Sequence, residues 1–480
     1  MRGTWLGVMA VLVLGQILIL PDSSIADEKS LPDILKEKGI LTEEEYQGAK
    51  RAEEAQKVPR PVEESSAQPV AGYKNGFFLQ TPDGKYKFVL NGYIRTQLRL
   101  YENNTSQDNE FKIRDGRLAL KGYFGKYWNS YLEGEFSTPS EGKFLKVAYL
   151  NCSYFSDLQM QAGQFKSPFS REFLTSNADI DTIERAMITE SGGLTPKYDI
   201  GIMLWGPKVL NGLLSYGIGV FNGYGPNNSD TNDDKDLVGR LVLSPFALTE
   251  VRALKGLEIG GSYQTGRETS DSLSTYKFQP KLPTDWAFFK EISYRGQRDR
   301  YGLDMAYKVG PFKLQGEWIY QRLEREKQAR VNPDTNQIVS TGGKLIDAPD
   351  LISWGWYVLG TYFVWGDENQ GIQLVARYEQ MDVDDDPVKK YQKANPMGKN
   401  TYATRWGNEL NLRGNTADVL TLGVNYFPIS NVKLAFNWFY QTLDNPYTTD
   451  KIIHDHEGRE VVTAKGHSMN AFYLLAQVKW

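Results

Sequence analysis

The sequence predicts an all-β fold: a sixteen-stranded antiparallel transmembrane β-barrel preceded by a short N-terminal helical segment. Three observations support this prediction. The 480-residue chain is 13% aromatic and contains 45 Gly, a composition that favours strands and tight turns. From residue 86 onward, segments of about ten residues alternate in polarity, as half-buried strands do. The connections between them alternate between tight turns and long polar loops, as expected of a barrel with two unlike ends.

The first 26 residues have the pattern of a signal peptide. Met1 and Arg2 precede a mostly apolar stretch from Leu6 to Leu20, and Ser24-Ile25-Ala26 forms a small-residue cleavage site. The stretch is shorter than the roughly 20 apolar residues of a membrane-spanning helix. We therefore expect an exported chain that begins near Asp27, with a retained signal anchor as the alternative.

Residues 27–58 are expected to form a periplasmic helical segment in two pieces. Pro32 suits a first helical turn, and Gly39 suits a C-terminal stop. Thr42 and Glu45 make a capping-box pattern for the second piece. The segment either tethers or oligomerises the protein, or it is a solvated head that packs on nothing, and the sequence leaves both interpretations open.

A proline-rich and Ser/Glu-rich stretch over residues 59–72 is expected to be an extended linker, and residues 73–480 are expected to form the barrel. The sixteen predicted strands span 86–101, 111–125, 129–137, 144–155, 158–167, 199–206, 213–223, 236–246, 256–266, 300–309, 312–324, 352–364, 371–382, 417–429, 432–443 and 470–480. An even number of strands returns both ends of the barrel to one side of the membrane.

Each predicted strand separates an apolar face from a polar one. In the first strand Phe88, Leu90 and Ile94 share one face, whereas Arg95 and Arg99 lie on the other. The interior of a sixteen-stranded barrel is too wide for wall side chains to fill. We therefore expect the apolar face to meet lipid and the charged face to line water.

Two stretches, 111–122 and 163–172, together with Ile183-Glu184-Arg185, resemble the phosphate-selective porin O and P family. The resemblance implies a homotrimeric porin of the bacterial outer membrane whose third external loop, here Ser167 to Asp199, folds into the lumen and narrows it. A solvated external loop is the alternative. Many relatives carry adjacent arginines where this chain has Arg114-Asp115, and an acid at that place lowers the expected affinity for oxyanions.

The whole chain has a formal net charge of −4, but its inward-facing strand positions are basic. They include the basic residues Lys87, Arg95, Arg99, Arg117, Lys121, Arg240, Lys308, Lys313, Arg377, Lys433 and Lys479, and the acidic residues Asp115, Glu133, Glu135, Asp304, Glu317 and Glu379. Basic groups at a constriction favour anions. With loop residues added, the candidate pore-lining and anion-binding residues are Lys87, Arg95, Arg99, Arg117, Lys121, Lys166, Arg171, Arg185, Arg240, Lys313 and Arg377. The alternative is that these bases only pair with neighbouring carboxylates.

The expected function is an anion-preferring porin for passive diffusion of small anions, with phosphate suspected. Its expected partners are those anions, outer-membrane lipid, two further copies of the chain and, through the helical segment, peptidoglycan or another periplasmic component. An enzyme is not expected, because the three histidines fall in the last predicted loop and Cys152 has no evident base. No cofactor or nucleic-acid site is expected. A structural or adhesive barrel of little conductance and a non-selective porin are the competing interpretations.

Overall fold

The computed structural model describes residues 36, 38–39, 42–57, 68–102, 107–137, 144–190, 192–230, 232–268, 277–285, 292–294, 296–324, 330–331, 338–339, 350–383, 416–444, 452–454, 460–463 and 465–480. The chain divides into two compact units, Met1–Gln68 and Pro69–Trp480. The predicted signal peptide and most of the predicted linker lie outside the described residues.

The first unit contains the helix α3 (Glu43–Lys57). The Thr42 backbone N–H donates to Glu45 Oε2 at 2.9 Å, and the Glu45 backbone N–H donates to Thr42 Oγ1 at 3.4 Å. These two bonds confirm the predicted capping box. The Thr42 backbone N–H and hydroxyl both donate to Glu45 Oε2, and they lower the pKa of the Glu45 carboxyl. Gly39 adopts φ +68°, a left-handed conformation that suits the predicted helix stop.

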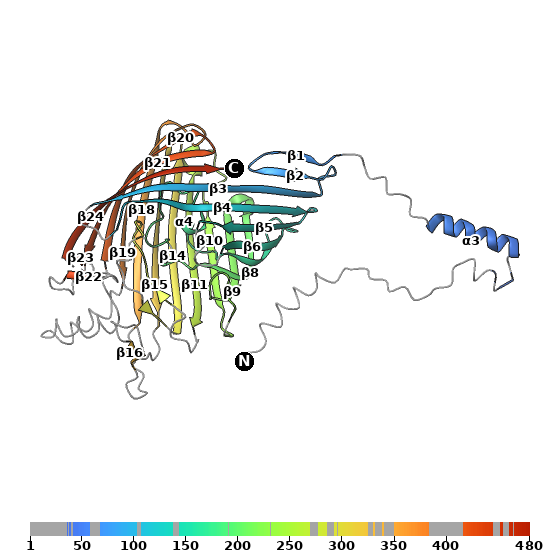
Figure 1. Cartoon of the computed structure of the whole chain (residues 1–480), viewed down its shortest axis with the longest axis horizontal. Coiled ribbons are helices and arrows are strands. Elements are labelled where there is room, and N and C mark those ends of the chain that lie inside the picture. The colour runs from blue at the N-terminus through green and yellow to red at the C-terminus, as the bar shows by residue number, and fades with distance from the viewer. Residues whose placement is uncertain are drawn as a thin grey trace. The chain divides into compact units, whose positions relative to one another are not determined.

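The second unit is a closed sixteen-stranded antiparallel barrel (Figure 1). Each wall strand pairs with the next one along the chain, and the last pairs with the first through Lys479↔Tyr93 to Ala471↔Tyr101. The wall strands are β3 (Tyr86–Tyr101), β4 (Glu110–Phe124), β5 (Trp128–Glu135), β6 (Leu145–Cys152), β7 (Gln159–Lys166), β8 (Tyr198–Val209), β9 (Leu214–Phe221), β10 (Asp236–Leu243), β11 (Leu257–Glu268), β14 (Gly296–Val309), β15 (Phe312–Leu323), β18 (Leu351–Gly366), β19 (Gly371–Val383), β20 (Thr416–Ile429), β21 (Val432–Asp444) and β24 (Lys465–Lys479). All sixteen predicted strands are present.

The remaining elements are short. A hairpin of β1 (Val70–Tyr73) and β2 (Phe77–Gln80) pairs with the start of β3, so β1 begins inside the predicted linker. The short elements that are not part of the barrel wall are α4 (Arg171–Leu174), η2 (Leu210–Gly212), α5 (Arg252–Lys255), β12 (Lys277–Phe278), β13 (Ile292–Ser293), β16 (Arg330–Val331), β17 (Ile338–Val339), β22 (Ile452–His454) and β23 (Glu460–Thr463). No helix in the described part of the chain is long and apolar enough to cross a membrane.

The two faces of the wall follow the predicted parity. Phe88, Leu90 and Ile94 of β3 are exposed on the outside. Arg95 and Arg99, on the opposite face, are buried inside the barrel. Alternation along each strand therefore placed the side chains on the correct sides.

The prediction that the whole inner face lines water is wrong. A hydrophobic cluster fills part of the lumen, with Met187 and Ile188 from the connection between β7 and β8. They belong to the same cluster as inward residues of later strands, such as Ile319, Val419 and Phe439. Wall side chains alone are too short to fill a sixteen-stranded barrel, but a folded loop supplies the missing volume.

Candidate functional site

The connection between β7 and β8, residues 167–197 and here named loop three, lies inside the barrel. Its backbone is bonded to side chains that project inward from distant strands. Lys433 Nζ donates to the Ile180 carbonyl at 2.9 Å, and the Met187 N–H donates to Glu379 Oε2 at 2.6 Å. Further wall side chains that bond this backbone are Asn425, Asn437 and Gln477. These contacts confirm that loop three folds into the lumen.

Ion pairs hold the same loop to the wall. Glu184 Oε1 accepts Arg99 Nη2 at 3.0 Å, and Arg171 Nε binds Asp304 Oδ1 at 2.8 Å. The other loop-to-wall pairs are Glu172–Arg377, Asp179–Lys479, Asp181–Lys313, Glu184–Arg114, Glu190–Arg114 and Arg171–Glu258. Charges of both signs on loop three thus pair with opposite charges on the wall.

Arg114 is a lumen residue that strict alternation could not predict. The register between β3 and β4 shifts so that Arg95 faces Asp115 while Thr96 faces Ile113. The extra residue, Arg114, then turns inward with Asp115 and reaches Glu184. A β-bulge changes the direction of a side chain in this way. The amino-acid pattern of β4 does not predict this bulge.

The structure pairs most of the predicted anion-binding residues with carboxylates. Those in ion pairs are Arg95, Arg99, Arg117, Arg171, Arg240, Lys313 and Arg377. Arg95, Arg99 and Arg377 are also 0%, 1% and 0% exposed, so they do not line an open passage. A buried arginine needs such compensation, because an unpaired charge away from water is costly.

Four of the predicted residues have no carboxylate within 4.0 Å among the described residues: Lys87, Lys121, Lys166 and Arg185. Lys121 Nζ lies 5.1 Å from the centre of the Tyr123 ring, and Lys87 Nζ lies 4.6 Å from that of Phe78. Lys166 and Arg185 both donate to the Thr175 carbonyl, so they hold the backbone of loop three. Their positive charges are bound by neutral groups and are not neutralised.

Loop three fills the lumen unevenly. The inward side chains of β18 to β21, such as Tyr357, Arg377 and Asn437, are almost completely buried. In contrast, six inward side chains of β4 to β6 are partly exposed, although Ala119, Glu135, Val147 and Asn151 on the same strands are buried. The partly exposed ones are Lys121, Tyr123, Asn129, Tyr131, Glu133 and Tyr149. The space left in the barrel therefore lies along β4 to β6.

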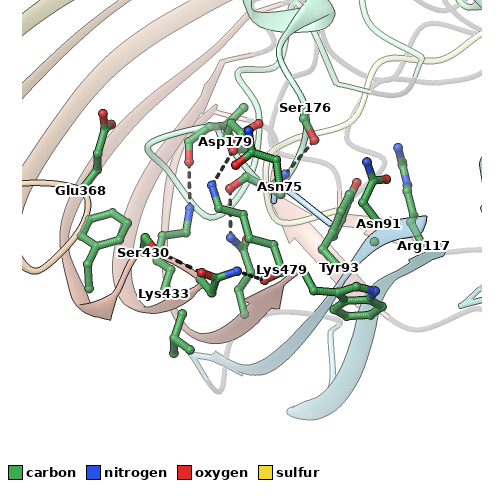
Figure 2. A pocket seen from close by; sticks show the side chains of 18 of the residues that line it. Asn75, Asn91, Tyr93, Arg117, Ser176, Asp179, Glu368, Ser430, Lys433 and Lys479 are labelled. Atoms are coloured by element: carbon green, nitrogen blue, oxygen red, sulfur yellow. Dashed lines mark hydrogen bonds and ion pairs between the residues drawn. The ribbon is translucent and has the colours of Figure 1, made fainter. Parts of the chain in front are cut away.

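A cavity of about 930 Å³ opens between loop three and the short-turn end of the barrel, where turns 367–370 and 430–431 lie. We name it the vestibule. Figure 2 shows Lys433 bonded to loop three, and Lys479 beside Asp179 at 3.0 Å. The basic side chains of the vestibule are Lys74, Arg117, Lys433 and Lys479, and the acidic ones are Asp179, Asp181, Glu133 and Glu368. The four acids, of which Asp179 and Asp181 belong to loop three, equal the four basic side chains in number.

A second loop enters the barrel at the opposite, long-loop end. Residues 277–285 lie between β11 and β14, and Asp285 binds Arg99 Nη1 at 2.7 Å and Lys112 Nζ at 2.8 Å. Burial alone would raise the pKa of Asp285, but the charges of Arg99, Arg114 and Lys112 outweigh it and hold this pKa below its usual range.

Two further inward arginines, Arg298 and Arg300, were not among the predicted pore-lining residues. β14 begins at Gly296 and not at residue 300 as predicted, so Arg298 fell outside the predicted strand. Arg300 was the first residue of that strand and shares the inward parity of Asp304, but it was left out of the candidates. The earlier start of β24 likewise places His467 in a strand and not in a loop.

Comparisons with known proteins agree with this architecture. The sequence model of the family described as phosphate-selective porin O and P matches residues 91–455. The chain belongs to this family. The barrel fold and the porin family together point to a channel of the bacterial outer membrane and not to an enzyme.

Individual relatives of this porin are distant. An uncharacterized protein of Aquifex aeolicus is 25% identical over 49% of this chain, and the porin spans only 56% of that relative. A loop-deletion mutant of OmpT, an outer membrane protein of Vibrio cholerae, is 12% identical with a TM-score of 0.50, covering 82% of this chain and all of that one. An anion-selective porin from Comamonas acidovorans is 13% identical with a TM-score of 0.48 and the same coverage. At such identities the solved structures support the fold alone.

Proposed function

We propose that this porin forms a water-filled channel that prefers anions and lets small ones, such as phosphate, diffuse passively. The solute would pass through the vestibule and along the partly exposed inner face of β4 to β6. On this route, lysines provide compact positive charge and arginines provide paired donors for an oxyanion. Because a channel must also release its solute, attraction has to stay weak at each position.

The supporting observation is the imbalance among lumen charges that have no opposite partner. Among the described residues, Lys87, Lys121, Lys166, Arg185 and Lys433 have no carboxylate within 4.0 Å. Two inward acids, Asp199 and Glu317, have no basic partner, and both accept backbone N–H groups. Burial without a carboxylate disfavours the charged forms of Lys166 and Lys433. The other three bases still outnumber the two acids, although most of the basic wall is neutralised.

The reversal potential of the purified porin in planar bilayers, measured across a KCl gradient, tests this proposal. We expect the sign of an anion-preferring channel. Lys121→Glu should move the reversal potential toward cations, because it reverses an unpaired charge on the route. Lys126→Glu, at an exposed residue in the turn between β4 and β5, is the matched control and should change it little. A cation-preferring wild type would contradict the proposal.

A second candidate, a structural barrel that conducts poorly, is favoured by one observation. The hydrophobic cluster and the loop-to-wall ion pairs occupy the lumen beside β18 to β21. Single-channel recording separates the candidates, since a structural barrel should give no discrete conductance steps. Steps that are blocked in part by added phosphate would favour the anion channel.

We also propose that the porin is a homotrimer and that the segment containing α3 contacts peptidoglycan or another periplasmic partner. The family resemblance supports the first proposal, and the largely polar sequence of α3 suits an aqueous compartment.

Native mass spectrometry of the detergent-extracted porin should give three copies. Pull-down on purified peptidoglycan should retain the full-length porin but not a version that lacks residues 27–58.

A further inference from the structure

A second, smaller cavity lies away from the vestibule, against the inner face of β10, β11 and β14. Its volume is about 100 Å³, enough for a few heavy atoms. The last part of loop three contributes Gly192 and Gly193, and the segment after β9 contributes Gly223 and Gly225. Gly192 and Gly193 pack so closely on neighbouring backbone that a Cβ would lie within 2.5 Å of a carbonyl oxygen, so only glycine fits at these two positions.

Arg300 projects into this cavity without a neutralising partner. Its Nε donates to Gln321 Oε1 at 2.6 Å and its Nη1 donates to Gln264 Oε1 at 2.6 Å. No described carboxylate lies within 4.0 Å of the guanidinium, which is only 7% exposed. Two amide oxygens thus fix its orientation and leave its charge uncompensated, with Nη2 free of any described partner.

Arg298 stands beside it with one donor unused. Its Nη2 is paired with Asp236, and its Nη1 donates to the Tyr294 hydroxyl at 2.8 Å. Its Nε is buried and has no hydrogen-bond partner among the described residues, and the side chain is 5% exposed. A buried donor without an acceptor is destabilising, and an oxyanion beside it would supply that acceptor.

The charge of the cavity lining favours a negative ligand. Lys197, Arg298 and Arg300 face Asp199 and Asp236. Asp236 is engaged by Arg298, and Asp199 accepts the N–H groups of Ile200 and Gly223 at 2.8 and 2.7 Å. Asp236 is therefore neutralised by Arg298, whereas Asp199 has backbone partners only. Three basic side chains against two acids leave the lining with one positive charge in excess.

We propose that this cavity binds one small oxyanion, with Arg300 as its principal ligand and Arg298 beside it. A planar guanidinium offers paired N–H donors that match the oxygens of a phosphate or a carboxylate. The inference rests on the proposed function, because it takes its ligand from the same class of solutes. It adds a discrete binding site at the long-loop side of the lumen, separate from the vestibule.

The thermal midpoint of the full porin in detergent tests the site, because ligand bound only to the folded state raises it. Sodium phosphate, sulfate, acetate and chloride would be titrated at constant ionic strength. We expect a saturable rise with at least one oxyanion and none with chloride, and the comparison of phosphate with acetate separates a tetrahedral ligand from a carboxylate. Equal rises with all four salts, or none, would overturn the proposal.

Arg300→Gln should weaken the oxyanion response at least tenfold in apparent affinity, whereas Arg300→Lys should keep part of it. Without oxyanion, Arg300→Gln should be no less stable than wild type, because it removes an uncompensated buried charge. Arg252→Gln, on the exposed helix α5, is the control. An unchanged response in Arg300→Gln would overturn the proposal.

Failure of the site can be told from failure of the proposed function. The reversal potential measures selectivity along β4 to β6 and depends on Lys121, whereas the oxyanion-dependent midpoint depends on Arg300. Lys121→Glu should therefore retain the rise of the thermal midpoint with oxyanion. Loss of this rise in Lys121→Glu would count against a site at Arg300.

Discussion

Arg95 Nη1 and Asp115 Oδ2 form an ion pair of 2.9 Å in which both side chains are only 1% exposed. Asp115 Oδ1 also accepts Asn177 Nδ2 of loop three at 2.9 Å. One carboxylate therefore joins β3, β4 and the loop that fills the lumen. The acid that sets this sequence apart from many family members thus has a structural role in the wall.

Asp115→Asn should destabilise the barrel strongly. The change leaves Arg95 buried without its charge partner, a loss typically worth about 3 to 5 kcal/mol. Urea unfolding in lipid vesicles would measure the free energy of unfolding, with Asp83→Asn in an exposed turn as the control. A loss of the same small size in both variants would show that the pair contributes little.

Met187→Ala should loosen loop three. Met187 is fully buried in the hydrophobic cluster, and truncation of such a side chain typically costs about 2 to 5 kcal/mol. Because this cluster holds the loop against the wall, we expect a larger and noisier single-channel conductance. Leu174→Ala, which alters an exposed leucine of the same loop, should leave the conductance unchanged. If both variants changed the conductance equally, the hydrophobic cluster would not determine the size of the pore.

The contact of Asp285 with Arg99 and Lys112 should be sensitive to strong acid. Because the folded-state pKa of Asp285 lies below its ordinary value, the contact stabilises fully at neutral pH. That contribution is lost as pH falls from the ordinary carboxyl range through the folded-state pKa. The difference in thermal midpoint between wild type and Asp285→Asn should therefore be constant from pH 8 to about pH 5 and shrink below about pH 4. A difference that grows on acidification would contradict this account.

Strict two-residue alternation explains how much of the fold could be predicted from the sequence. Residues such as Phe88 and Arg95 differ in polarity and in parity, so the strands and the orientation of their faces could be predicted. Inward apolar residues such as Val419 and Phe439 gave no such signal, because their partners, Met187 and Ile188, lie in a loop distant in sequence. Pairing of that kind follows from tertiary contacts that periodicity does not record.

The basic character of the candidate site could be predicted from the sequence, but the contacts of its residues could not. The basic residues of the wall were found by parity, but their carboxylate partners depend on where loop three lies. Arg114 was missed because a bulge turns it inward. Arg298 was missed because its strand begins four residues before the predicted start, whereas Arg300 stood at the very start of the predicted strand and was not counted.

The central claim is that an aqueous passage leads from the vestibule along β4 to β6, while loop three closes the lumen beside β18 to β21 on the long-loop side of the vestibule. Ser176 of loop three lines the vestibule, whereas Ser353 on the inner face of β18 is 0% exposed. Ser176→Cys and Ser353→Cys would be made in a Cys152→Ser background and treated with a charged, membrane-impermeant methanethiosulfonate during bilayer recording. We predict that only Ser176→Cys is labelled and loses current. Labelling and block of Ser353→Cys, with Ser176→Cys unaffected, would contradict the account.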